Sequence, residues 1–113
     1  MNFTTTQRGS VTVIAVQGNL MGGPDASALN STLHEMVTNG TTRVVLNLRE
    51  VQFMNSSGLG ILIGGASTMR NAGGGLAIAE ASEKILALIT ITRLGKVLAT
   101  YPTLDAAVAS FPQ

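Results

Sequence analysis

The sequence contains no cysteine and a single histidine, His34. Without cysteine the chain forms no disulfide and offers no thiolate to a metal. One histidine and six dispersed carboxylates also provide no cluster of ligands with the spacing of a metal site. The sequence therefore predicts neither a metal nor another cofactor.

Charged residues are also scarce: they make up 12% of the chain, against 45% apolar residues, and the net charge is +1. The seven basic residues are scattered from Arg8 to Lys96, so they form no electrostatic footprint for nucleic acid. The chain is too hydrophobic for a disordered protein, and 113 residues suit one domain, residues 1–113, with one core. The thinly charged surface is compatible with a weak homodimer.

Long hydrophobic runs are missing from the sequence. No apolar stretch approaches the roughly 18 residues that span a bilayer. The first residues, MNFTTTQRGS, also lack the basic start and apolar run of a signal peptide. We therefore expect a cytoplasmic protein that does not insert into a membrane.

Apolar patterns of two kinds alternate along the chain. Short β-branched runs predict strands, and apolar residues at helical spacing predict helices between them. This alternation predicts an α/β layered fold with parallel strand pairs, and the opening segment adds an antiparallel edge strand. The expected strands are residues 3–9, 10–18, 42–48, 76–80 and 96–102, and the expected helices are 25–38, 57–70, 83–95 and 103–111.

The second of these helices carries two glycines in its interior. Gly64 and Gly65 each cost about 1 kcal/mol of stability relative to alanine. We therefore expect both to be compensated by close packing against another element. The helix is expected to end near Arg70, before the turn at residues 73–75.

Residues 53–60, FMNSSGLG, stand where a strand gives way to this helix. Short amide and hydroxyl side chains before an apolar pattern accept hydrogen bonds from the first N–H groups of a helix, which makes them a cap. A helix start also favours negative charge, so the same place can hold a phosphate, either bound or attached to a serine. Both interpretations remain open on spacing alone.

Three enzymatic or nucleotide-binding interpretations fit poorly. A serine hydrolase needs a base, but His34 lies in a predicted helix and no G-x-S-x-G elbow surrounds Ser56 and Ser57. The dinucleotide pattern places its third glycine where this chain has Ile63. A P-loop requires lysine after its last glycine, whereas Gly65 is followed by alanine and serine.

Residues 44–65, VVLNLREVQFMNSSGLGILIGG, closely resemble the signature of the bacterial anti-sigma factor antagonists of the STAS-domain family. That signature is a hydrophobic strand, a short loop to a pair such as Phe-Met, and then Asp-Ser-Ser/Thr-Gly-Leu-Gly. VTVIAVQGNL resembles the family's second strand and its Gly-x-Leu turn, and LGKVLATYPTLDAAVAS resembles its last strand and helix. The resemblance implies a mixed β-sheet of about five strands with about four α-helices packed on it, and no enzymatic activity.

The resemblance also implies a partner-switching role in bacterial signal transduction and transcription regulation. An unmodified antagonist binds an anti-sigma factor that is itself a serine kinase, and so releases the sigma factor. The kinase phosphorylates the first serine of the motif, Ser56 here, and a metal-dependent, PP2C-type serine phosphatase resets the phosphoprotein. The alternative is a STAS subunit of another assembly, such as a lipid-transport ABC complex or a signalling scaffold.

Residues around Ser56 are assigned to partner binding by the same resemblance. Gly58 and Gly60 are expected to admit partner backbone, Leu59 either contacts the partner or packs in the core, and Met21 is either exposed or tucked onto the following helix. Two departures from the family pattern remove negative charge: Asn55 replaces the usual aspartate, and Met21-Gly22-Gly23 replaces a polar or acidic turn. Ser57 is interpreted as structural or as a secondary site. The assigned contact residues are Asn55, Ser57, Gly58, Leu59, Gly60, Met21 and Gly22.

Overall fold

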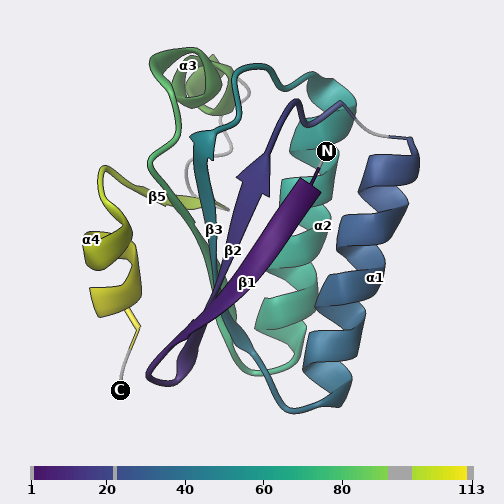
Figure 1. Cartoon of the computed structure of the whole chain (residues 1–113), viewed down its shortest axis with the longest axis vertical. Coiled ribbons are helices and arrows are strands. Elements are labelled where there is room, and N and C mark those ends of the chain that lie inside the picture. Colours follow the sequence, from purple (N-terminus) through teal and green to yellow (C-terminus); the bar gives the residue numbers. More distant parts are fainter. Residues whose placement is uncertain (1, 22, 92–97, 112–113) are drawn as a thin grey trace.

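The computed structural model describes residues 2–21, 23–91 and 98–111, except the side chains of Asp25 and Ala26. Five strands form one sheet in the order β1-β2-β3-β4-β5 (Figure 1). β1 is antiparallel to β2, and the other neighbouring pairs are parallel. The mixed sheet and its antiparallel edge strand are therefore as predicted. The strands are β1 (Asn2–Arg8), β2 (Val11–Gln17), β3 (Arg43–Glu50), β4 (Gly75–Ala79) and β5 (Ala99–Tyr101).

Four helices surround the described sheet. α1 and α2 lie side by side on one face, and α4 packs on the other face against β3, β4 and β5 (Figure 1). α3 lies at the end of the sheet where β2 and β3 end (Figure 1). None of the described helices has both the length and the apolar character that crossing a bilayer requires. The helices are α1 (Pro24–Thr38), α2 (Ser56–Asn71), α3 (Glu83–Ile91) and α4 (Leu104–Ala109).

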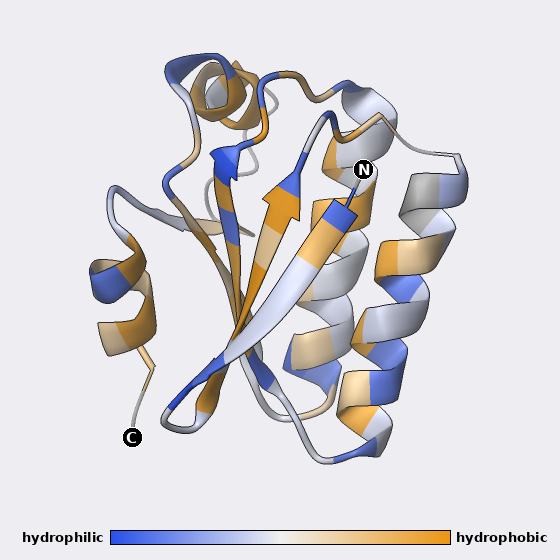
Figure 2. Ribbon diagram, in the orientation of Figure 1, coloured by the Kyte–Doolittle hydropathy of each residue, from blue (hydrophilic) through white to orange (hydrophobic). Residues whose placement is uncertain are grey.

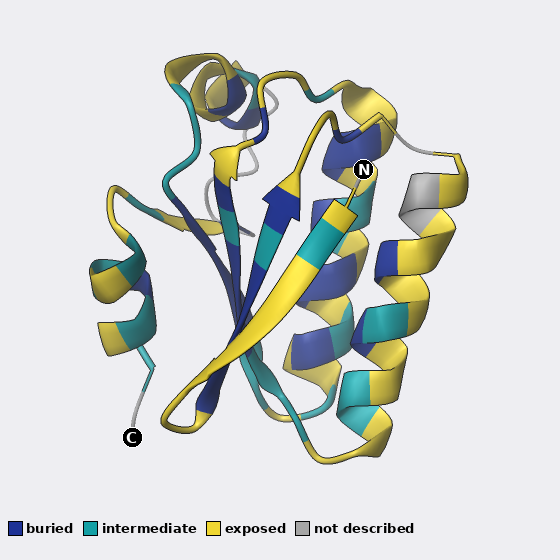
Figure 3. Ribbon diagram, viewed as in Figure 1, coloured by how far each residue is buried: buried dark blue, intermediate teal, exposed yellow. Residues whose placement is uncertain are grey.

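The core has two parts because the central strands are apolar on both faces. Ile14 and Val16 of β2 join the larger cluster, which also contains Leu29 and Leu33 of α1. The alternate residues of β2, Val11 and Val13, join a smaller cluster under α4. Figures 2 and 3 show the same division, with apolar and buried positions along the inner strands and the facing sides of the helices. β2 is thus the interior strand that its sequence predicts.

The two glycines inside α2 have different surroundings. A Cβ on Gly65 would lie 2.8 Å from Leu33 Cδ1, so this glycine allows α2 to approach α1 closely. A Cβ on Gly64 would meet no atom within 4 Å. Close packing is therefore confirmed for Gly65, and the same prediction is wrong for Gly64, which lies on the exposed side of the helix.

The ends of most elements fall within a few residues of the expected positions. α1 ends at Thr38 and is capped by Asn39, which is followed by Gly40 at φ 86°, and α2 ends at Asn71, shortly before Gly73 at φ 89°. These left-handed positions are the helix stops that glycine favours. The predicted end of the third helix at residues 94–95 and the predicted start of the last strand at 96–97 lie outside the described residues.

Candidate functional site

The loops that follow β2 and β3 are joined at the carboxyl end of the sheet. The N–H of Gly18 donates to the carbonyl of Glu50 at 3.3 Å, and the N–H of Leu20 donates to the carbonyl of Phe53 at 2.9 Å. Leu20 also forms an isolated parallel bridge with Met54. Parallel pairing thus continues past the ends of both strands and brings Met21 close to the start of α2.

Asn55 links this loop to the first turn of α2. Its backbone is extended, and its side-chain Oδ1 accepts a hydrogen bond from the N–H of Gly58 at 2.8 Å, as an N-cap residue does. The side-chain Nδ2 donates to the carbonyl of Met21 at 3.2 Å. The amide therefore uses both of its polar atoms, whereas an ionised aspartate has no donor for the second bond.

Ser56 is the first residue of α2, and its side chain is exposed. The capping side chain is that of Asn55, so the cap does not occupy the Ser56 hydroxyl. Among the described residues no hydrogen-bond partner of this hydroxyl is found. The backbone N–H groups of a first helical turn lack intrahelical acceptors and favour negative charge. The arrangement therefore presents a hydroxyl to solvent at a place that stabilises an anion.

Gly58 and Leu59, both assigned to partner binding, face the interior of the domain. A Cβ on Gly58 would lie 1.9 Å from the carbonyl oxygen of Leu20 and 2.9 Å from Met54 Cγ. The glycine is therefore required for contact between the two loops within the chain. Leu59 is 3% exposed and belongs to the larger core cluster, as its helical spacing indicates. Neither residue offers a surface to a partner in this structure.

Ser57 and Gly60 are exposed and line a groove between α1 and α2. The groove has a volume of about 370 Å³, and its other lining residues are Ser27, Asn30, Ile61 and Gly64. A Cβ on Gly60 would meet nothing within 4 Å, so the space over this residue is open. The structure thus leaves both residues accessible, and their contact with a partner stays a prediction.

A profile of the STAS domain matches residues 2–107 of this chain, which is nearly its whole length. The chain belongs to the STAS domain family. The resemblance inferred from residues 44–65 is thereby confirmed, together with the α/β fold of five strands and four helices.

Several relatives of this STAS domain are named anti-sigma factor antagonists. A Paenibacillus polymyxa anti-sigma F factor antagonist is 33% identical over 58 residues, so the match spans about half of this chain and half of that relative. An anti-sigma factor antagonist from Mycobacterium paratuberculosis is 27% identical, with a TM-score of 0.80 over 97% of this chain and 92% of that one. The Bacillus protein SpoIIAA in its phosphorylated form has the same fold, with a TM-score of 0.74, 19% identity and coverage of 96% and 98%.

Two large apolar side chains are exposed near Ser56 in this STAS domain. Met21 is 47% exposed and Phe53 is 51% exposed, which settles the open question about Met21 in favour of exposure. Lys84 of α3 places its Nζ 5.3 Å from the centre of the Phe53 ring. Phe53 has no role among the residues assigned from the sequence, because its exposure becomes visible only in the structure.

A catalytic role for Ser56 has no support in the geometry. His34 is exposed on α1, ten residues after Pro24 and therefore about 15 Å along the helix from its start. Across the described ranges, no three side chains of the metal-ligating types are grouped. Gly22, the remaining residue assigned to partner binding, lies outside the described residues.

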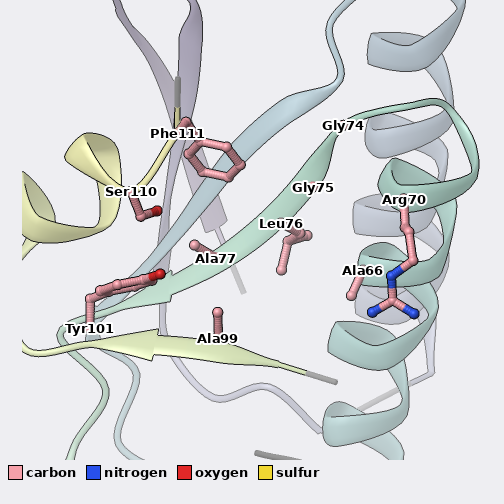
Figure 4. Close-up of a pocket in the computed structure, with 10 residues that line it drawn as sticks. All are labelled: Ala66, Arg70, Gly74, Gly75, Leu76, Ala77, Ala99, Tyr101, Ser110 and Phe111. Carbon is pink, nitrogen blue, oxygen red and sulfur yellow. The ribbon is translucent and has the colours of Figure 1, made fainter. Parts of the chain in front are cut away.

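A separate cavity of about 330 Å³ lies between the far end of α2, the start of β4, β5 and Phe111 (Figure 4). Its polar lining comes from Arg70, Tyr101 and Ser110, and the Ser110 hydroxyl donates to the carbonyl of Ala107 at 2.6 Å. Arg70 is in the last turn of the helix that Ser56 begins, which separates them by about 20 Å. The cavity is therefore not part of the candidate site.

Substitutions of Asn55 separate its cap from its link to Met21. Asn55→Ala removes both bonds and is expected to lower the free energy of unfolding by about 1 kcal/mol. Asn55→Asp keeps an oxygen for the N–H of Gly58 and loses the donor to Met21, so it is expected to cost less. Urea denaturation of the two variants and the unaltered protein measures the three free energies of unfolding.

The loss of the link is expected to appear in the loop itself. Hydrogen exchange followed by mass spectrometry should show faster exchange across residues 18–21 in Asn55→Asp than in the unaltered protein. An unchanged exchange rate in that loop would show that the bond from Asn55 to Met21 does not restrain it.

Proposed function

We propose that this STAS domain is an anti-sigma factor antagonist whose binding is switched off by phosphorylation of Ser56. The observation that carries the proposal is the exposed Ser56 hydroxyl at the first residue of α2, with the capping role taken by Asn55. Exposed Met21, whose carbonyl accepts from Asn55, and exposed Phe53, three residues before Ser56, supply apolar surface for a partner. The names of its relatives supply the class of partner, a protein that inhibits a sigma factor.

A phosphoryl group at Ser56 is compatible with the fold. It adds a charge of about −1.5 to −2, and the start of a helix favours that charge by up to about 2 kcal/mol. No acidic residue lies in the first turn of α2 to oppose it. The phosphorylated form of SpoIIAA, which has the same fold, is in keeping with a modification that leaves the architecture intact.

The same group acts differently across an interface. A partner that covers Met21 and Phe53 also removes water from the surface around Ser56. Burial of the phosphoryl dianion without a cation then costs affinity. Each 1.4 kcal/mol of that cost lowers the binding constant about tenfold. One modification therefore releases the partner without unfolding the antagonist.

The proposed partners follow from this switch. The anti-sigma factor is also the serine kinase that modifies Ser56, and a PP2C-type phosphatase removes the phosphate. The antagonist itself acts by binding in the cytoplasm, with no cofactor and no catalytic step of its own.

Phosphorylation in vitro tests the proposal. The protein is incubated with the anti-sigma factor kinase of its own cell and Mg-ATP, and the modified residue is located by mass spectrometry. We expect one phosphoryl group on Ser56, and none on Ser56→Ala, while Ser57→Ala remains a substrate.

Affinity purification from the native cell is the complementary test. We expect recovery of the kinase together with the unmodified protein. Recovery of a transporter ATPase instead, or modification at a residue other than Ser56, would contradict the proposal and favour a STAS subunit of a different assembly.

A further inference from the structure

β1 is an open edge of the sheet. It pairs with β2 on one side, and six of its seven residues are exposed (Figure 3). An edge strand presents a row of backbone N–H and C=O groups that another strand can pair with. Natural proteins usually protect such edges with charges, proline or a bulge, so the protection of β1 decides whether the edge is usable.

The backbone groups that point outward follow from the hairpin. β1 and β2 pair without a bulge from Asn2 opposite Gln17 to Arg8 opposite Val11, across the two-residue turn Gly9-Ser10. Residues that flank a two-residue turn form a hydrogen-bonded pair, and such pairs alternate along an antiparallel ladder. The N–H and C=O groups directed away from β2 are therefore those of Phe3, Thr5 and Gln7.

The usual protections are missing along this edge. β1 has the sequence NFTTTQR, with no proline and no charge before Arg8. The Arg8 guanidinium is bound to Asp105 of α4 at 2.9 Å. The Gln7 side chain bends back to its own hairpin, where its Nε2 donates to the carbonyl of Gly9 and its Oε1 accepts from Thr12. Three β-branched threonines occupy the middle of the strand, as suits strand pairing.

We infer that β1 is a dimerisation edge, at which a second copy of this chain adds its own β1 in the antiparallel direction. A two-fold axis through Thr5 makes the contact self-complementary. In this register Thr5 faces Thr5 of the second copy, and Phe3 faces Gln7 of the second copy. Arg8 faces the uncharged Asn2 of the second copy, so no like charges oppose each other.

The register leaves Ser56 open in both copies. Asn2 pairs with Gln17 at the end of the sheet where α2 begins, so the start of β1 lies at the same end as Ser56 (Figure 1). Antiparallel pairing directs the Ser56 ends of the two copies away from each other. The contact consists mainly of one strand from each copy, so a weak, concentration-dependent dimer is expected. This inference does not depend on the proposed function.

Thr5→Pro tests the edge without breaking the hairpin. Proline removes an outward N–H and is tolerated on an edge strand whose N–H faces solvent. Sedimentation equilibrium over a wide range of concentrations should show a dimer for the unaltered protein. We expect the dimer dissociation constant of Thr5→Pro to be about tenfold higher or more, whereas Thr5→Val, which keeps the N–H, should dimerise as before.

Thr5→Lys gives a second, independent test in case the proline disturbs folding. It places two ammonium groups opposite each other at the axis, so it should dissociate the dimer, and added salt should partly restore it. Circular dichroism confirms that each variant is folded. A protein that stays monomeric at the highest concentration, or a dimer that both Thr5→Pro and Thr5→Lys leave intact, would overturn the inference. Ser56→Asp should leave dimerisation unchanged.

Discussion

Gly58→Ala is expected to lower the free energy of unfolding by about 3 kcal/mol. The added Cβ would lie 1.9 Å from the carbonyl oxygen of Leu20, which is a backbone atom and not the end of a flexible side chain. Leu20 has no room to withdraw, because its N–H is bonded to Phe53 and its side chain is fully buried. The substitution therefore has to separate the two loops that form the site.

Gly60→Ala is the matched control for this experiment. It adds the same methyl group two residues along the same helix, where nothing lies within 4 Å. Alanine should stabilise that helical position by up to about 1 kcal/mol. Urea denaturation of both variants measures the difference, and equal stability of Gly58→Ala and the unaltered protein would contradict the proposed contact between Gly58 and Leu20.

Ser56→Asp is expected to weaken binding to the anti-sigma factor about tenfold or more, equivalent to at least about 1.4 kcal/mol. The aspartate carries part of the charge of a phosphoserine to an exposed position three residues after Phe53. Within the protein the same charge is favourable, since it lies at the start of α2. The melting temperature should therefore stay the same or rise slightly while affinity falls.

Ser67→Asp separates the effect of position from that of charge. Ser67 is also an exposed serine on α2, but it lies eleven residues after Ser56, about 16 Å along the helix. Isothermal titration calorimetry should show that Ser67→Asp binds the anti-sigma factor as the unaltered protein does. Equal loss of affinity in both variants would mean that general charge, and not the Ser56 position, controls binding.

The architecture could be predicted from local patterns because each element carries its own signal. The continuous apolar run of β3 and the alternation in β2 are typical of interior strands, and the stripe from Leu29 to Val37 is typical of a helix packed on a sheet. The cap at the start of α2 was also visible as a short polar residue before an apolar pattern. Its assignment to Asn55, and not to the serines, required the structure.

The roles of individual glycines could not be predicted in the same way. A Cβ on Gly58 would meet Leu20, and a Cβ on Gly65 would meet Leu33 and Leu76. None of these leucines is adjacent to its glycine in the sequence. Gly64 and Gly65 are adjacent letters, yet one points to solvent and the other into the contact between α1 and α2. A single sequence shows that a glycine is present, whereas only the tertiary structure shows which atoms approach it.

Asn55 shows how one substitution within a family signature can be accommodated. The amide caps α2 as an aspartate would, and its second polar atom holds the carbonyl of Met21. The loop that carries Met21 is thus fixed beside Ser56 by a bond that an ionised carboxylate does not form. We interpret Asn55 as a residue that positions the contact surface, in addition to its role as a cap.

The most direct test of the account compares the unmodified protein with the same protein phosphorylated on Ser56. Calorimetric titration with the anti-sigma factor gives the two affinities, and thermal unfolding gives the two stabilities. We predict that phosphorylation weakens binding at least about tenfold and leaves the unfolding temperature essentially unchanged. Equal affinity of the two forms, or loss of affinity that accompanies unfolding of the domain, would contradict the central claim.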